Sequence, residues 1–207
     1  MKKKKATWVK ARHNFFVKTL FPPVGLYTKL KYHIDVEKCR DKRQYLILMN
    51  HQTAFDQFFV SMAFYRQIYF VASEDLFSKG FVSSIIRFVV NPIPIKKQAT
   101  DLKAVMTRMR VAKEGGTIAM APEGNRTFSG KTEYMNPAVA RLAQKLKLPI
   151  AIFRIEGGYG VHPRWADDVR KGKMKAYVSR VIEPEEYLKL SADDFYTLIT
   201  QELYINE

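Results

Sequence analysis

Residues 46–59 read LILMNHQTAFDQFF, in which an apolar run ends in polar side chains before apolar residues resume. The run from Tyr45 to Met49 has the length and composition of a buried strand, and the window from Ala54 to Arg66 predicts a helix. A strand that leads through a short polar turn into a helix is the repeating unit of α/β sheets. The stretch therefore indicates an α/β fold with His51 directly beyond a strand end.

The rest of the chain repeats this alternation. Two prolines in the run Val89–Ile95 favour an edge of the sheet or the end of a strand over a central strand. The chain has 207 residues, which is within the size of one domain, so we expect a single α/β domain whose mixed, largely parallel sheet is flanked by helices. Further strands are predicted at Ile68–Ala72, Thr117–Ala121, Ile150–Ile155 and Lys173–Ile182, and helices at Val82–Phe88, Ala99–Lys113, Pro137–Lys147 and from about Ala192.

A second unusual stretch, MAPEGNRTFSG at residues 120–130, also follows a predicted strand. In open α/β sheets, ligands bind beyond the carboxyl ends of the strands. Both stretches lie at such ends. We therefore expect them to form one site although about 70 residues separate them.

His51 and Asp56 can meet only if His51 lies in the turn before the helix, because five residues of continuous helix would place them on different faces. Thr53 is a plausible N-cap, which puts Asp56 at the third helical position with its carboxylate directed back at the helix entry. A carboxylate there can fix the tautomer of His51 and leave the other ring nitrogen free as a base. The alternative is that Thr53 and Asp56 form only a capping box.

Glu123, Gly124 and Arg126 predict a sharp turn that presents a carboxylate and a guanidinium. The guanidinium fork matches phosphate or carboxylate. Lys96 and Lys97, directly after Ile95, could add positive charge to the same edge. The alternative is a surface turn held by an exposed Glu123–Arg126 ion pair, which would contribute about 0 to 1 kcal/mol.

Charge is concentrated at the N-terminus. Residues 1–50 contain thirteen Lys and Arg against three acids, so ten of the fifteen net positive charges lie there. Such a patch favours a polyanion, either nucleic acid or an anionic membrane face, although it could also be merely solubilising. Cys39 is the only cysteine and the four histidines show no ligand spacing, so neither an intrachain disulfide nor a thiol-based metal cluster is expected.

Residues 7–20 place Trp8, Phe15 and Phe16 on one arc of a helical wheel and Lys10 and Lys18 on the other side. A basic amphipathic helix of this kind is typical of a segment that lies in a membrane interface. A helix packed onto its own domain is the alternative. No run is long and apolar enough to span a bilayer. We therefore predict a membrane-associating helical segment at residues 1–35 and the α/β domain at residues 36–207.

The two stretches resemble known motifs. NHQTAFD is similar to the H-x-x-x-x-D block, and APEGNRT to the F-P-E-G-T-R block, of the glycerolipid acyltransferases typified by lysophosphatidic acid acyltransferase. NPIPIKK and KLKLPIAIFRI resemble two weaker blocks, and the match covers roughly residues 45–160. The resemblance implies transfer of a fatty acyl group from a thioester, acyl-CoA or acyl carrier protein, to a glycerol hydroxyl of a lysophospholipid in phospholipid biosynthesis. It also implies that His51 and Asp56 are catalytic, that Glu123, Gly124, Arg126, Lys96 and Lys97 bind substrate, and that no metal or other cofactor is required.

Three departures bear on the acceptor. Ser73, Glu74 and Asp75 stand where the family usually has a lysine that is thought to hold the acceptor phosphate. Asn125 replaces a threonine, and Phe153 lies near the place of a missing proline. These changes leave the acceptor headgroup open.

Two other functions are compatible with the composition. One is a basic nucleic-acid-binding protein, although no zinc-finger, homeodomain or RNP signature is present. The other is a catalytically silent lipid-binding relative. For the enzyme we expect peripheral attachment to the cytoplasmic side of a membrane, an anionic membrane surface as partner and no nucleic acid.

Overall fold

A computed structural model describes residues 8–64, 66–74, 80–95 and 102–205. Seven strands form one sheet in the order β1-β7-β6-β2-β5-β3-β4. All neighbouring strands are parallel except β6 and β7. This confirms the predicted mixed, largely parallel sheet. The strands are β1 (Ile34–Val36), β2 (Leu46–Met49), β3 (Ile68–Ser73), β4 (Ile93–Ile95), β5 (Thr117–Met120), β6 (Ile150–Glu156) and β7 (Met174–Ile182).

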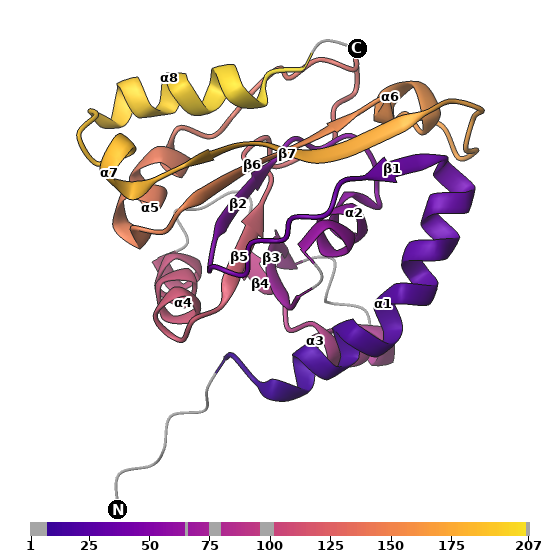
Figure 1. Cartoon of the computed structure of the whole chain (residues 1–207), viewed down its shortest axis with the longest axis horizontal. Coiled ribbons are helices and arrows are strands. Elements are labelled where there is room, and N and C mark those ends of the chain that lie inside the picture. The colour runs from indigo at the N-terminus through magenta and orange to yellow at the C-terminus, as the bar shows by residue number, and fades with distance from the viewer. Residues whose placement is uncertain (1–7, 65, 75–79, 96–101, 206–207) are drawn as a thin grey trace, which may run out of the picture.

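Helices cover both faces of the sheet (Figure 1). Strand β2 shows why: Ile47 and Met49 enter one apolar core, whereas Leu46 and Leu48 enter the other. A strand buried on both faces reads as a continuous apolar run. The helices are α1 (Ala11–Tyr32), α2 (Asp56–Phe64), α3 (Gly80–Val89), α4 (Leu102–Lys113), α5 (Ala138–Leu146), α6 (Gly158–Val161), α7 (Pro184–Tyr187) and α8 (Ala192–Leu203).

Strand β4 forms an edge of the sheet, as the two prolines predicted. Pro94 pairs with Ala72 of β3 and has no strand on its other side. Proline lacks an N–H, so an edge position loses no ladder hydrogen bond. The beginning of the helix predicted from Ala99 lies outside the described residues, and α4 begins at Leu102.

Helix α1 differs from the prediction in length and in the face it buries. It continues through Pro22 and Pro23 to Tyr32. His13, Val17 and Tyr32 are buried on its inner side, whereas Phe15, which belongs to the predicted apolar arc, remains exposed, as does Leu20. Tertiary packing outweighs the disruptive effect of proline here.

Both ends of α1 are fastened to the domain. The Glu114 carboxylate accepts the backbone N–H groups of Trp8 and Val9 at 2.7 and 2.9 Å. After Tyr32, strand β1 pairs in parallel with β7 across the predicted domain boundary at residue 35. The alternative of a helix packed on its own domain therefore holds for one face of α1. Among the described residues, no helix has both the length and the apolar content that crossing a bilayer requires.

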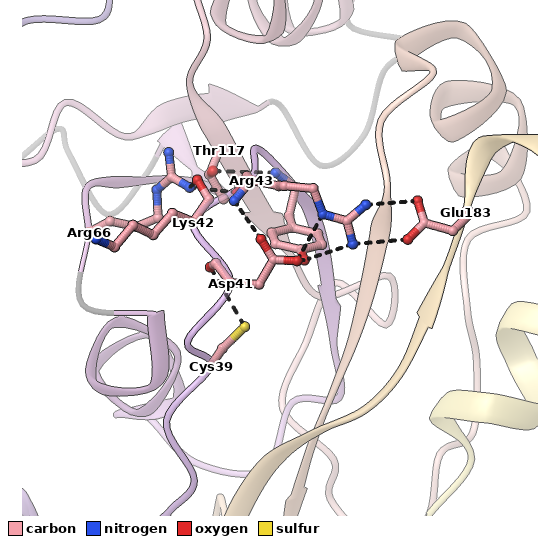
Figure 2. A network of polar contacts seen from close by, with 8 residues as sticks. Cys39, Asp41, Lys42, Arg43, Arg66, Thr117 and Glu183 are labelled. Carbon is pink, nitrogen blue, oxygen red and sulfur yellow. Dashed lines mark hydrogen bonds and ion pairs between the residues drawn. The ribbon is translucent and has the colours of Figure 1, made fainter.

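An ionic network lies at the amino end of β2 (Figure 2). The Arg43 guanidinium donates to Asp41 at 2.8 Å and to both oxygens of Glu183, which follows β7, at 3.0 and 3.2 Å. The Tyr45 hydroxyl donates to Asp41 at 2.6 Å. Because β7 runs opposite to β6, its carboxyl end meets the amino end of β2, so this network lies at the other edge from the two sequence motifs.

Candidate active site

Asn50 fixes the turn that follows β2. Its side-chain amide donates to the Ile155 carbonyl at 2.8 Å and its oxygen accepts the Ile155 N–H at 2.7 Å. Backbone pairing between β2 and β6 ends at Met49 and Phe153. The two hydrogen bonds of the Asn50 side chain continue the pairing of β2 with β6 beyond Met49. They therefore fix the position of the backbone at which the turn begins.

Asp56 is the first residue of α2 and is fully buried. Its carboxylate accepts the Gln52 N–H at 2.7 Å, the Thr53 N–H at 2.9 and 3.0 Å, and the Thr53 hydroxyl at 2.7 Å. The helix begins three residues later than the predicted N-cap at Thr53, although the carboxylate does reach back to the Thr53 N–H as a capping box would. The carboxylate therefore organises the whole turn.

His51 completes this arrangement. Its Nδ1 lies 2.8 Å from Asp56 Oδ2, and its side chain is 24% exposed against 0% for Asp56. Both oxygens of Asp56 already accept N–H or O–H donors, so the shared proton belongs to Nδ1. This leaves the lone pair on Nε2 of a partly exposed ring. The predicted contact between His51 and Asp56 is confirmed, and it coexists with the capping interaction that was its alternative.

The second stretch meets the first at His51. The Glu123 carboxylate accepts the backbone N–H of His51 at 2.9 Å, and the Thr127 N–H donates to the His51 carbonyl at 2.9 Å. Gly124 has φ +71°, a left-handed conformation that glycine adopts without strain. The two motifs therefore lie at one edge of the sheet, as their positions after β2 and β5 predicted.

The Glu123 side chain is partly withdrawn from solvent. Burial raises the pKa of its carboxyl to about 7, against the opposing effect of the hydrogen bond from the His51 backbone. No Glu123–Arg126 ion pair forms among the described residues, so the predicted alternative of a surface turn held by that pair is wrong. Sequence could not reveal this, because the partner of Glu123 is a backbone group of a distant segment.

Arg126 is half-buried, and its charge acts on Tyr32 and His162. Gly124 is exposed at the tip of the turn. Lys96 and Lys97, the other predicted substrate-binding residues, lie outside the described residues. Within the described part of the chain, no three His, Cys, Asp or Glu side chains converge as a metal site would require.

Helix α6, which the sequence analysis did not predict, packs against the turn between His51 and Asp56. A Cβ at Gly158 would lie 2.5 Å from Cβ of Gln52 and 3.2 Å from the Thr53 methyl group. Only glycine allows this approach. The adjacent pair Gly157-Gly158 after a predicted strand was the available signal. His162 follows α6 and contacts the Tyr32 hydroxyl through Nδ1 at 3.3 Å.

The sequence pattern of the family described as Acyltransferase matches residues 30–156, which include both motifs and every strand that positions them. The chain belongs to the acyltransferase family. The predicted resemblance to the acyltransferase family is thus confirmed. In this member of the family the two blocks converge on His51.

Two relatives show how far the similarity extends. The acyltransferase chain is 20% identical over 137 residues to the 1-acyl-sn-glycerol-3-phosphate acyltransferase of Bacillus subtilis (strain 168), over 66% of this chain and 65% of that relative's length. Its structure is similar to the crystal structure of the 1-acyl-sn-glycerophosphate (LPA) acyltransferase, PlsC, from Thermotoga maritima. The TM-score is 0.75 at 20% identity, over 92% of this chain and 78% of that one. The second likeness shows the fold.

Proposed function

We propose that this acyltransferase moves a fatty acyl group from a thioester to the free hydroxyl of a lysophospholipid, with His51 as general base. The observation that carries the proposal is the 2.8 Å contact between His51 Nδ1 and the buried Asp56 carboxylate. A base needs a defined tautomer and an accessible second nitrogen. Both conditions follow from that contact and from the partial exposure of His51.

The proposed reaction has one covalent exchange. The acceptor hydroxyl gives its proton to His51 Nε2 as its oxygen attacks the thioester carbonyl carbon. The carbon–sulfur bond then breaks, and the departing thiolate takes the proton from the imidazolium. Asp56 stabilises the imidazolium while it exists. Base catalysis of this kind contributes about 10² to 10⁴-fold, and the rest comes from holding two substrates at one edge.

The substrates follow from chemistry and from the relatives' names. The proteins from B. subtilis and T. maritima are named for acylated glycerol phosphates as acceptors. We propose an acceptor of that class, lysophosphatidic acid or a close analogue, whose phosphate is held by the Arg126 guanidinium. Glu123 keeps His51 in place through its backbone N–H. The donor is acyl-CoA or acyl carrier protein.

We also propose that the enzyme works on the surface of an anionic membrane, on its cytoplasmic side. Helices α1 and α3 lie side by side (Figure 1), with the Arg12 guanidinium 4.2 Å from the centre of the Phe88 ring. Together they expose several large apolar side chains: Phe15, Leu20, Leu26, Tyr27 and Leu30 on α1, and Phe81, Ile85 and Phe88 on α3. Apolar patches with basic neighbours favour lipid interfaces.

The test is product analysis with the full chain. Purified protein should release free thiol from acyl-CoA or acyl carrier protein only when a lysolipid is supplied, and the diacyl product should appear. His51→Ala should abolish this, whereas His33→Asn, at an exposed left-handed position that asparagine tolerates, should not. Turnover near normal in His51→Ala would remove the proposed base. Tight nucleic-acid binding without lysolipid-dependent thiol release would favour the rival function.

A further inference from the structure

Four basic side chains from separate segments gather beside the candidate active site. Lys31 comes from the end of α1, Arg126 from the turn after β5, and His162 and Arg164 from the segment after α6. We call Lys31, Arg126, His162 and Arg164 the cationic rim. Apart from Arg126, none of them belongs to the two sequence motifs.

Lys31 is directed toward the site by aromatic rings. Its Nζ lies 5.6 Å from the centre of the Tyr27 ring, 5.9 Å from that of Tyr32 and 6.0 Å from that of Phe55. Phe55 is the residue directly before Asp56. The ammonium therefore lies near the residue that leads from the His51 turn into α2.

Arg126 and the segment after α6 are also in contact. The Arg164 guanidinium donates to the Arg126 carbonyl at 3.4 Å, and His162 contacts the Tyr32 hydroxyl. Burial lowers the pKa of His162, and the positive charges of Arg126 and Lys31 lower it further. Lys31 and Arg126 are thus close enough for their charges to act on His162, and Arg164 lies against the Arg126 main chain.

Among the described residues, Lys31, Arg126 and Arg164 form no ion pair. Asp167 acts on His162 more weakly than either cation, and Asp56 is occupied by the donors of its own turn. Positive side chains that lie close together without a negative partner repel one another. An anion bound between them would relieve this repulsion.

We propose that the cationic rim binds the phosphate of the acceptor, and that Lys31 and Arg164 select a phosphomonoester headgroup over a phosphodiester one. This rests on the proposed function. The Thr127 N–H ties the Arg126 turn to the His51 carbonyl, so the rim lies next to the base, as a glycerol phosphate next to the attacked hydroxyl requires. A phosphomonoester carries up to two negative charges near neutral pH, whereas a phosphodiester carries one. Lys31 and Arg164 supply charge that Ser73 and Glu74 do not.

Kinetics on matched variants test the assignment. In Lys31→Gln and Arg164→Gln, the KM for lysophosphatidic acid should rise at least about fivefold with little change in kcat, because charge-assisted contacts to phosphate are lost. The KM values for lysophosphatidylcholine and acyl-CoA should stay within about twofold. Lys29→Gln and Lys171→Gln, also exposed but outside the rim, serve as controls. If the KM for acyl-CoA rises instead, the rim binds a phosphate of the donor and the assignment to the acceptor is wrong. If Lys31→Gln and Arg164→Gln behave like the two controls, the rim binds no substrate phosphate.

Binding without turnover separates this inference from the proposed function. A soluble short-chain lysophosphatidic acid should bind the wild-type chain in calorimetry more tightly than the matching lysophosphatidylcholine, and Lys31→Gln should remove the difference. If binding follows this pattern while no acyl transfer occurs, the rim stands and the proposed function falls. If acyl transfer occurs but Lys31→Gln and Arg164→Gln bind both lipids as the wild type does, the rim is overturned.

Discussion

The backbone N–H of His51 donates to the Glu123 carboxylate at 2.9 Å, which joins two motifs that lie 72 residues apart. The contact uses the main chain of His51 and leaves its ring free to face Asp56. Since burial raises the pKa of Glu123 to about 7, this link titrates in the physiological range.

Glu123 should make folding stability depend on pH. Its pKa is 4.5 in the unfolded chain and about 7 in the folded one, so the folded state binds the extra proton between these values. Its contribution is therefore fully present below pH 4.5 and is lost as the pH rises through 7. We expect Glu123→Gln, which keeps an oxygen for the His51 N–H, to gain Tm relative to the wild type as the pH rises across this window. Thermal melts from pH 4.5 to pH 8 check this, with the exposed Glu185→Gln as control; a constant difference would contradict it.

Asp56→Asn should lower kcat by at least about two orders of magnitude. In this variant the side-chain amide nitrogen replaces one carboxylate oxygen. In one orientation it would face the N–H groups of Gln52 and Thr53 that the carboxylate now accepts, and in the other it would donate to Nδ1 and impose the wrong tautomer on His51. Steady-state kinetics, with circular dichroism to verify folding, measure the effect. The exposed Asp168→Asn should behave as the wild type. An active Asp56→Asn enzyme would show that the carboxylate serves only the turn.

Gly158→Ala should impair catalysis although Gly158 carries no side chain. The added methyl group would meet Gln52 at 2.5 Å and displace the turn between His51 and Asp56. We expect kcat to fall at least about tenfold, since small misplacements of a base are costly. Gly160→Ala in the same helix is the control, because its methyl group would meet nothing within 4 Å. Equal activity of the two variants would mean that α6 does not position the turn.

The apolar side chains of α1 and α3 should bind lipid. Deleting α1 would not test this cleanly, because His13, Val17 and Thr28 are part of the interior. We propose Leu26→Ser, Leu30→Ser and Phe81→Ser together, at positions 61%, 67% and 81% exposed. Pelleting with anionic vesicles should weaken at least about tenfold, because each residue loses apolar burial in lipid. Moderate salt should also weaken the pelleting of the wild-type protein with anionic vesicles.

The matched control for lipid binding lies on another helix. Leu102→Ser and Met106→Ser alter α4 at positions 70% and 71% exposed, on a helix other than α1 and α3. These variants should pellet as the wild type does. If they lose as much binding as the α1 and α3 variant, exposed apolar area in general is responsible and the surface has no special role.

The network of Figure 2 should affect stability in acid and leave catalysis unchanged. The hydrogen bonds from Tyr45 and Arg43 lower the pKa of Asp41 to about 2 from 3.8. The associated stability is present above pH 3.8 and is lost as the pH falls through 2. We expect Asp41→Asn to melt below the wild type at pH 6 and to approach it toward pH 2, with unchanged kcat at neutral pH. A Tm difference that does not shrink in acid would contradict the assignment.

The strands around the site could be predicted because their signal is local. Residues 46–49, 117–119 and 150–153 are buried and read as largely apolar runs. Strand β1 has three residues and pairs with Met174–Ala176, so nothing in its own sequence distinguishes it from a loop. Helix α1 passes through two prolines for a similar reason, because its stability comes from distant partners.

The candidate site likewise has features that could be predicted from the sequence and features that could not. The five-residue spacing allows His51 and Asp56 to meet in a local turn, and the structure shows that they do. That the two stretches share one edge of the sheet followed from the rule that ligands bind at strand ends, whereas the hydrogen bond from the His51 backbone to Glu123 did not. Lys31 and His162 carried no such signal, because α1 and the segment after α6 meet only once the sheet is assembled.

The way α1 is fastened has a consequence for biosynthesis. Its beginning is held by Glu114, 106 residues away, and its end contacts His162, 130 residues away. Closing such long loops is slow and must await the residues that complete them. A ribosome therefore releases α1 long before it releases α6 and β7, and the aromatic and basic residues of that helix stay uncovered for most of translation. If α1 binds lipid as proposed above, the nascent chain can do so before the segments that complete its candidate active site have been made.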